Sequence, residues 1–236
     1  RGLGDVYKRQ GPATNMATTF LVIAHCIVKE NKIIEEWLVR DNYALAEELG
    51  FDVHQVAREK AAIPINQRLK DWNQSELDRV QKTVTHERQP FLGCSSSDSE
   101  AFIEALLQNI WNARLVGDVF QSYSDDALLH CSRNQTLKGR EEIAAFYAQI
   151  IGTVTQLKFS HDYCCSIPND SGGQDVAVRW TITGNHGGAG LYGEPTGTPL
   201  LILGESQFRI IDGLIAEEWT IFDELSILVQ IYRARL

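Results

Sequence analysis

A seven-residue segment occurs twice in this chain, and the repeat limits how the chain can be divided into domains. Residues 35–41 read Glu-Glu-Trp-Leu-Val-Arg-Asp, and residues 217–223 read Glu-Glu-Trp-Thr-Ile-Phe-Asp, at an offset of 182 residues. The flanks keep this offset, since Ile33 aligns with Ile215. Such self-similarity indicates that one structural unit is present twice. Because little chain precedes the first copy, we expect that copy to be truncated.

The composition of the 236-residue chain excludes several classes of protein. With 44% hydrophobic residues the chain can bury an ordinary core, which excludes disordered and collagen-like classes. The formal net charge of −9, without a cluster of Lys and Arg, argues against a nucleic-acid partner. Five cysteines form no Cys-x-x-Cys pair, so we expect free thiols and a cytoplasmic protein. No apolar run reaches the roughly 18 residues of a membrane helix, so we expect no membrane partner.

The apolar segment 18–28 follows Lys8 and Arg9, as the apolar part of a signal peptide would. Its aligned counterpart, 200–210, lies deep inside the chain, and no small-residue cleavage site follows the first copy. We therefore predict a strand at 18–28. Residues 1–15 begin with Arg rather than Met, and we expect them to be a non-native or disordered leader.

Residues 16–50 are predicted to form a strand hairpin and a helix. Strands at 18–28 and 33–40 are joined by a tight Glu30-Asn31 turn, where Asn tolerates positive φ. A helix at 42–49 follows, and Gly50 ends it.

A helical connector and linker is expected at 51–97. Two pairs of residues resemble capping pairs at helix N-termini: Asp52 with Gln55, and Ser75 with Asp78. Residues 89–97 contain Pro, Gly and three Ser, a composition that is typical of a linker.

Residues 98–236 are predicted to hold helices first and long strands afterwards. Ser99 begins a helix with one broad apolar face, and Gly117 ends it. Further elements are a helix at 119–123, a strand near 127–131, a helix at 141–151, strands at 158–167, 175–186, 200–210 and 214–222, and a helix at 224–232. Helices followed by a run of antiparallel strands indicate an α+β fold.

Four segments in this second half resemble one protein family. They are Gly-Asn-His-Gly-Gly at 184–188, Gly-Glu-Pro-Thr-Gly-Thr-Pro at 193–199, Phe-Arg-Ile-Ile-Asp-Gly at 208–213, and the Glu-Glu-Trp segment that ends in Asp223. In this order they resemble the SnoaL-like polyketide cyclases of the nuclear transport factor 2-like superfamily.

The resemblance implies a cone in which a curved antiparallel sheet wraps around N-terminal helices. It implies one complete SnoaL-like domain at 98–236, and the C-terminal remnant of a first such domain at 16–50. It also implies a dimeric protein, either a homodimer or an intramolecular pseudo-dimer. The best-known members of the family close a polyketide ring by intramolecular aldol condensation, without metal or cofactor.

Asp223 is the candidate catalytic carboxylate. An aldol closure needs a base that takes a proton from carbon, and a group that stabilises or protonates the enolate oxygen. In the family an Asp on the sheet serves as general acid/base, and the resemblance assigns that role to Asp223. The alternative is that Asp223 caps the helix that follows, for which Asp is a preferred residue. Asp41 has the same two interpretations, but its truncated unit offers no complete cavity.

His186 is the candidate assisting group. It follows apolar residues of the same strand parity, so it is expected to line the mouth of a hydrophobic pocket, where a proton donor is useful. The alternative is a rim residue bonded to the backbone. His130 is a second, weaker candidate.

Aromatic side chains are candidates for the walls of the cavity. At helical and strand spacing they are expected first in the core, and as substrate-binding residues second. The set comprises Trp111, Tyr123, Tyr147, Trp180 and Trp219, and His130 is a further substrate-binding candidate.

No metal is expected, because the metal-ligand types at 161–165 alternate between the two faces of a strand. We therefore predict a cofactor-free acid/base enzyme that acts on a small hydrophobic or polyketide-like carbonyl ligand. The alternative is a non-catalytic small-molecule-binding or dimerisation module of the same fold, since fold does not dictate chemistry.

Overall fold

The computed structural model describes residues 16–82, 88–90, 99–188 and 190–236. Its helices are α2 (Asn42–Glu48), α3 (Val53–Ala62), α4 (Gln67–Lys82), α5 (Ser99–Trp111), α6 (Val119–Ser122), α7 (Gly139–Thr153) and α8 (Glu224–Arg233), with a short 3-10 turn, η1 (Val116–Asp118). Its strands are β1 (Val22–Lys29), β2 (Lys32–Arg40), β3 (Tyr123–Cys131), β4 (Gln135–Lys138), β5 (Val154–Pro168), β6 (Gln174–His186), β7 (Pro199–Ile211) and β8 (Leu214–Phe222).

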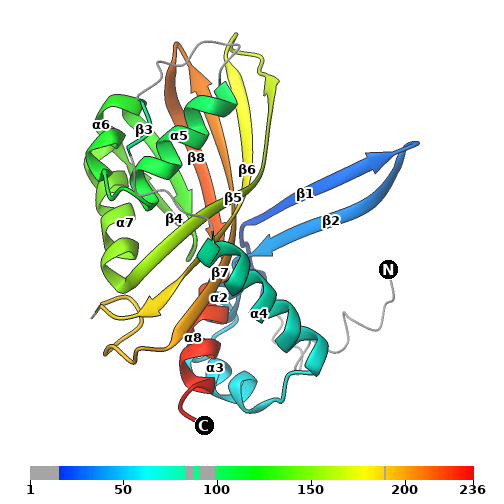
Figure 1. Ribbon diagram of the computed structural model, residues 1–236. Coiled ribbons are helices and arrows are strands. Elements are labelled where there is room, and N and C mark those ends of the chain that lie inside the picture. The colour runs from blue at the N-terminus through cyan, green and yellow to red at the C-terminus, as the bar shows by residue number, and fades with distance from the viewer. Residues whose placement is uncertain (1–15, 83–87, 91–98, 189) are drawn as a thin grey trace.

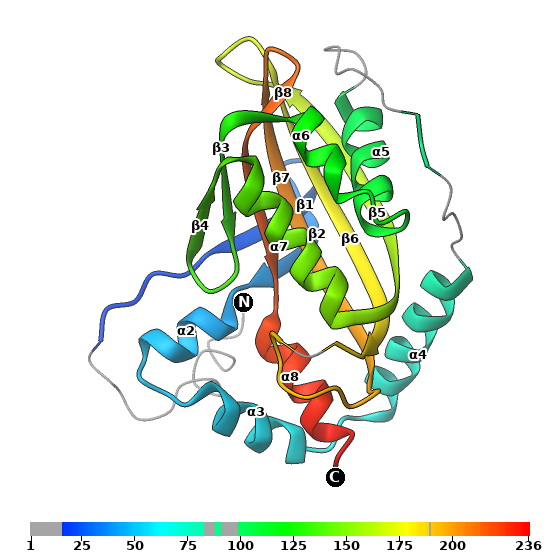
Figure 2. The ribbon, with the colours of Figure 1, turned by 90° about the vertical axis from the view of Figure 1, so that its left-hand side faces the viewer.

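Six strands form one curved sheet in the order β4-β3-β8-β7-β6-β5. Neighbouring strands are antiparallel, except that β3 and β8 run parallel. Helices α5, α6 and α7 cover one face, which we call the inner face (Figure 1). The view in Figure 2 shows α7 lying across this face, with α4 next to the β5 edge of the sheet. The predicted α+β architecture, a curved sheet wrapped around helices, is confirmed.

Strand alternation decides which side chains enter the core. On β6, Val176, Val178 and Trp180 share one parity, and each is at most 2% exposed. Their neighbours Ala177 and Arg179 point to the opposite, outer face. The inner rows of the strands meet the apolar face of α5, which carries the fully buried Ile103. Each large apolar side chain buried in this way contributes roughly 1.5–3 kcal/mol to stability.

The β1–β2 hairpin repeats the geometry of the β7–β8 hairpin. At the offset of the sequence repeat, the pair Val22–Arg40 corresponds to Gly204–Phe222, and every other pair of β1 and β2 corresponds likewise to a pair of β7 and β8. The β-bulge also recurs at the same place, after Ile27 in one hairpin and after Arg209 in the other. Equal residues at equal offsets therefore fold into the same local unit. The assignment of residues 16–50 to a first SnoaL-like domain stays a prediction.

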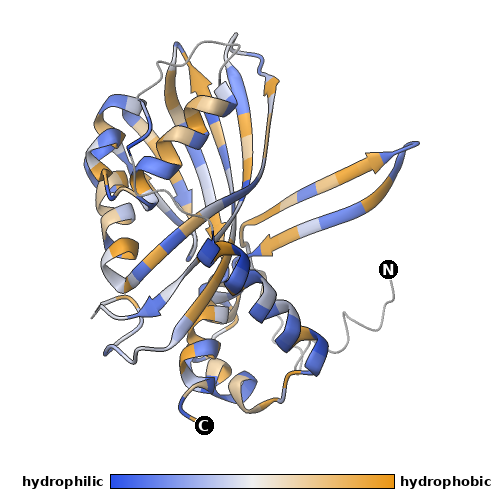
Figure 3. Cartoon of the chain, viewed as in Figure 1, coloured by the Kyte–Doolittle hydropathy of each residue, from blue (hydrophilic) through white to orange (hydrophobic). Residues whose placement is uncertain are grey.

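The turn of the first hairpin also agrees with its sequence. Glu30 and Asn31 both have positive φ, 50° and 58°, as a two-residue hairpin turn requires. Beyond its base, the hairpin extends away from the sheet (Figure 1). Apolar side chains near its tip are exposed, among them Val28, Ile33 and Ile34 at 60–61%, and orange segments mark them in Figure 3.

Two local predictions need correction, and a third lies mostly outside the described residues. Ser75 does not cap a helix, because α4 already begins at Gln67, where the Asn66 side chain accepts a hydrogen bond from the amide of Leu69. The helix that begins at Ser99 ends at Trp111, before the predicted stop, since Arg114 takes positive φ of 62°. Most of the predicted linker, residues 91–98, lies outside the described residues.

Candidate active site

A buried carboxylate, Glu218, lies in the core between the inner face of the sheet and the helices. On β8, Glu218, Thr220 and Phe222 point to the inner face, and each is at most 3% exposed. Glu217 and Trp219 point to the outer face and are half-buried. Glu218 has no exposed surface, and the groups around it are hydroxyls rather than cations.

Three hydroxyl groups hold this carboxylate. Tyr123, at the start of β3, donates to Oε2 at 2.6 Å, and Tyr147, from α7, donates to Oε1 at 2.8 Å. Thr220 donates to the same Oε1 from its own strand. The two tyrosine hydroxyls lie 3.3 Å apart. The carboxylate is thus fixed from three elements that lie far apart in the sequence.

The hydrogen bonds continue along the inner face of the sheet. Ser206 on β7 lies 2.7 Å from the Thr220 hydroxyl, and the indole nitrogen of Trp180 on β6 donates to Ser206 at 2.9 Å. A connected polar path therefore runs from Glu218 across three strands to Trp180.

Burial changes the acidity of these groups. It raises the pKa of Glu218, while hydrogen bonds from Thr220, Tyr123 and Tyr147 oppose the rise. Burial and the Glu218 carboxylate together raise the pKa of Tyr123 and of Tyr147 well above the usual value, so both phenols stay protonated donors. A buried carboxylate with a raised pKa next to two neutral phenols is a candidate for proton transfer.

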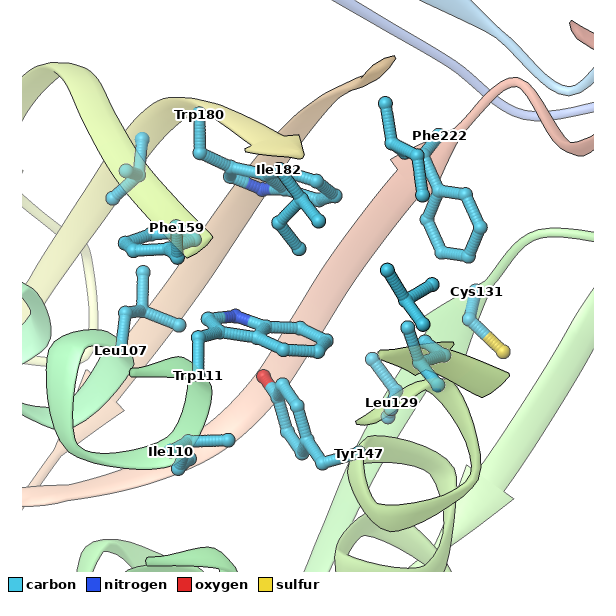
Figure 4. Packing of buried hydrophobic residues seen from close by; sticks show 14 of the residues in the cluster. Leu107, Ile110, Trp111, Leu129, Cys131, Tyr147, Phe159, Trp180, Ile182 and Phe222 are labelled. Atoms are coloured by element: carbon cyan, nitrogen blue, oxygen red, sulfur yellow. The ribbon is translucent and has the colours of Figure 1, made fainter. Parts of the chain in front are cut away.

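Aromatic rings pack against one another in the core that contains Tyr147 (Figure 4). Trp111 contacts Tyr147 edge-on at a centroid distance of 5.1 Å and stacks on Phe159 at 6.3 Å. Trp180 lies 6.1 Å from Phe222. Rings from two helices and three strands thus form one aromatic cluster, and Tyr147 of this cluster donates to Glu218, which has no exposed surface.

A second polar cluster lies at the α8 end of the sheet. The His186 ring meets the Tyr192 ring at 6.4 Å. The Tyr192 hydroxyl and Arg133 both donate to Oε2 of Glu224, at 2.9 and 2.6 Å. His186 is fully buried, its Nδ1 lies 3.1 Å from the Thr196 hydroxyl, and its Nε2 has no partner among the described residues. Burial lowers the pKa of His186, and the nearby Arg235 lowers it further, so the ring is neutral at pH 7.

The fold and this interior arrangement can be compared with known proteins. The family model described as SnoaL-like polyketide cyclase matches residues 102–231. The chain belongs to the SnoaL-like polyketide cyclase family. No curated protein sequence matches it.

Solved structures show the same fold. A protein from Jannaschia sp. CCS1, assigned as a SnoaL-like polyketide cyclase, is 18% identical, with a TM-score of 0.51 over 62% of this chain and 96% of that one. IdmH of Streptomyces antibioticus, assigned as a polyketide cyclase, is 20% identical, with a TM-score of 0.46 over 58% and 99%. Nuclear transport factor 2 of Cryptosporidium parvum is 11% identical, with a TM-score of 0.42 over 54% and 93%. The Jannaschia structure and the family match show that this domain has the fold of the SnoaL-like proteins, as predicted from its sequence.

The structure brings four of the predicted substrate-binding residues together. Trp111, Tyr123, Tyr147 and Trp180 all face the interior and are at most 2% exposed. They surround Glu218, which the sequence analysis did not select.

The other two lie elsewhere in this SnoaL-like domain. Trp219 points to the outer face, where it stacks on His130 at 5.5 Å, so neither residue meets the interior set. His130 lies 2.9 Å from Oε1 of Glu217. Both positions follow from strand parity, because His130 alternates with the buried Leu129 and Cys131 on β3.

Asp223 follows the last inward-facing residue of β8 and caps α8. Its Oδ1 accepts from the amide of Ser226 at 3.2 Å, and its Oδ2 accepts from the side chain of Asn42 at 2.8 Å. Burial raises the pKa of Asp223, and the hydrogen bond from Asn42 opposes the rise. Asp223 lines a groove of about 780 Å³ outside the sheet, which is a different space from the one that holds Glu218. The structure therefore does not bring Asp223 and His186 into one hydrogen-bonded pair.

Glu218 could have been found from the sequence by following parity across strands. It shares parity with Thr220 and Phe222, and its cross-strand partner on β7 is Phe208, which belongs to a buried row. An acidic residue in such a row requires buried partners. In the described part of this SnoaL-like chain, no group of three His, Cys, Asp or Glu side chains is arranged to hold a metal ion. The helices described also include none with the length and apolar character to cross a membrane.

Proposed function

We propose that this chain is an acid/base catalyst of the cyclase type, with Glu218 as the proton-transfer group and a small apolar carbonyl compound as the substrate. The observation that carries the proposal is the Glu218 carboxylate, which is fully buried and held only by the hydroxyls of Tyr123, Tyr147 and Thr220. Membership of the SnoaL-like family supports a cyclase-like role.

The proposed reaction is an intramolecular aldol closure. The Glu218 carboxylate takes a proton from the carbon next to a carbonyl, and the electron pair of that C–H bond forms the enolate. The enolate carbon then attacks a second carbonyl of the same molecule, which forms a C–C bond and leaves an alkoxide. Glu218, now protonated, returns the proton to the alkoxide oxygen, so the enzyme ends in its starting state.

Tyr123 and Tyr147 would stabilise the negative charge that develops on oxygen. Both are neutral donors in a fully buried site, and a preorganised donor in such a site contributes more than it does in water. Their hydroxyls are shared with Glu218 in the absence of substrate, so a carbonyl oxygen would replace the carboxylate as their acceptor.

Asp223 with His186 remains the second proposed catalytic pair. Each has a perturbed pKa, which is frequent in functional sites. Asp223 also stabilises α8 as its N-cap, and this contact alone accounts for the presence of an Asp there.

Four single variants test the proposal. Turnover of a panel of linear di- and triketones is measured for the wild type, Glu218→Gln, Glu217→Gln, Asp223→Asn and Asp41→Asn. We expect Glu218→Gln to lower kcat by at least 100-fold, while Glu217→Gln, whose side chain points to the outer face, stays within about threefold.

The other outcomes assign the site differently. If Asp223→Asn alone abolishes turnover and Asp41→Asn does not, the base is Asp223 rather than Glu218. If neither the wild type nor any variant turns over a substrate that binds, the chain is a non-catalytic binding module of the same fold.

A further inference from the structure

A cavity lies outside the sheet, and Glu218 is not among the residues that line it. Its volume is about 780 Å³, within the roughly 300–1,000 Å³ typical of ligand pockets. The cavity, which we call the outer groove, lies between the outer face of β5, β6 and β7, the strand β2, and the helices α4 and α8. Its lining includes Trp37, Trp72, Arg179, Leu203, Glu205 and Val229.

Arg179 presents an uncompensated positive charge to the outer groove. Its guanidinium lies 4.1 Å from the centre of the Trp37 ring and forms no hydrogen bond or ion pair with another described residue. Three other arginines line the groove: Arg79 is already neutralised by Glu76 and Asp162, at 2.7 and 2.9 Å, Arg233 donates to the backbone oxygens of Lys60, Ala61 and Ile63, and Arg40 lies on β2. Stacking on Trp37 holds the planar guanidinium in place and leaves its N–H groups available.

Glu205 is an unpartnered buried acid beside this arginine. It is 1% exposed, lines the groove, and neither of its carboxyl oxygens has a hydrogen-bond partner among the described residues. Arg179 and Glu205 are direct cross-strand partners on β6 and β7, yet no ion pair joins them. Burial raises the pKa of Glu205 to about 8, against the opposing effect of Arg179, so the group carries a proton at pH 7. A protonated carboxyl has one O–H to donate.

We propose that the outer groove binds an apolar carboxylic acid as its carboxylate, with Arg179 and Glu205 as the two groups that hold the carboxylate. The planar guanidinium matches a carboxylate in a bidentate pair, and the Glu205 hydroxyl donates to a second lone pair of the same oxygens. With this ligand bound, Arg179 and Glu205 both gain a hydrogen-bond partner, which neither has among the described residues.

The rest of the lining favours a monoanion with an apolar body. Leu69 and Trp72 from α4, Leu203 from β7 and Val229 from α8 supply apolar walls. Four arginines (Arg40, Arg79, Arg179 and Arg233) and three acids besides Glu205 (Glu76, Asp162 and Asp223) line the groove, so the small net positive charge suits one negative charge better than the two of a phosphate monoester. A carboxylate carries only one charge.

Calorimetric titration of the whole chain with 2-naphthoate at pH 7 tests this site, with 2-naphthamide as the neutral matched ligand. We expect the carboxylate to bind at least tenfold more tightly than the amide. Arg179→Met should weaken 2-naphthoate binding at least tenfold, and Arg179→Lys, which keeps the charge and loses the planar fork, at least threefold. Arg209→Met is the control, because Arg209 also lies on the outer face but pairs with Asp175 and Glu217.

Several results would overturn the proposal. These are no binding of 2-naphthoate at 5 mM, equal affinity for the amide, or affinity that is unchanged in both Arg179 variants. Loss of binding in Glu218→Gln would move the ligand to the cone interior. Binding that disappears as the protein self-associates would show that a second copy covers the groove. The titration of Glu218→Gln measures only the binding of 2-naphthoate, so its outcome does not depend on whether Glu218 is a catalytic residue.

Discussion

The side chain of Asn42 donates a hydrogen bond to Oδ2 of Asp223 over 2.8 Å, although 181 positions separate the two residues in the chain. Asn42 is the first residue of α2, and Asp223 is the N-cap of α8. Asp41 caps α2 in the same way, accepting from the amide of Ala44 as Asp223 accepts from that of Ser226. Each repeated segment thus ends in an Asp that caps the helix after it, and the N-termini of these two helices contact each other.

The cap at Asp223 predicts a defined loss of stability. Asp223→Ala should lower the free energy of unfolding by about 1 kcal/mol, because the amide of Ser226 loses its acceptor. Asp223→Ser keeps an acceptor and should recover most of this loss. Urea unfolding followed by circular dichroism measures the difference, and equal stability of the Ala and Ser variants would contradict a capping role.

The cap at Asp41 should matter more. Asp41 is fully buried, and its Oδ2 also accepts from the backbone amide of Asn134, so it joins the hairpin unit to the SnoaL-like domain. Asp41→Ala should destabilise the protein by roughly 2 kcal/mol, since the part-buried hydrogen bond from the amide of Asn134 is lost together with the cap. The same urea series measures this, and a loss smaller than that of Asp223→Ala would show that the contact to Asn134 contributes little.

Glu205 predicts how stability changes with pH. Its folded pKa of about 8 lies above its ordinary value of 4.5, so the folded state binds the proton more tightly than the unfolded state. The stabilisation from this group is complete below pH 4.5 and is lost as the pH rises through 8. Glu205→Gln cannot ionise and should lose less stability between pH 5 and pH 9, by roughly 4 kcal/mol. Parallel pH curves for the two proteins in urea unfolding would contradict the raised pKa.

Gly204 leaves space for the ring of Trp180. A Cβ at this position would overlap the indole, which is the group that donates to Ser206 in the path from Glu218. Gly204→Ala should cost roughly 1–3 kcal/mol and change the tryptophan fluorescence. The control is Gly117→Ala, because a Cβ there meets nothing within 4 Å. If both variants are as stable as the wild type, Trp180 does not need this space.

The exposed end of the β1–β2 hairpin predicts association. A two-stranded unit is marginal in water, and its apolar tip residues Val28, Ile33 and Ile34 are exposed. We expect a homodimer or an equivalent pairing with a second unit, which buries this surface. Sedimentation equilibrium and hydrogen exchange test it together: a strict monomer whose hairpin amides exchange freely would contradict the prediction.

Much of the fold could be predicted because its strands alternate clearly. The predicted strands at 158–167, 175–186, 200–210 and 214–222 lie within β5, β6, β7 and β8. The parallel pairing of β3 with β8 was not predicted, because it joins segments that no local pattern connects. The short strand β4 was also missed, since four residues show too little periodicity.

The site was harder to predict than the fold. Periodicity separates the residues of β8 into two sets, but it does not say which set faces the helices. Trp219 was grouped with the cavity aromatics, whereas the helices cover the set that contains Glu218. An acidic residue is expected at the surface when only the sequence is known. The partners that allow Glu218 to be buried, Tyr123 and Tyr147, come from distant elements.

The most direct test of the central claim is proton abstraction by Glu218. The protein is incubated in D₂O with a small diketone that cannot cyclise, and exchange of the protons next to its carbonyls is followed by ¹H NMR. The wild type should accelerate exchange over buffer, Glu217→Gln should do so equally, and Glu218→Gln should return the rate to that of buffer. Undiminished exchange by Glu218→Gln would contradict the role of Glu218 as the base.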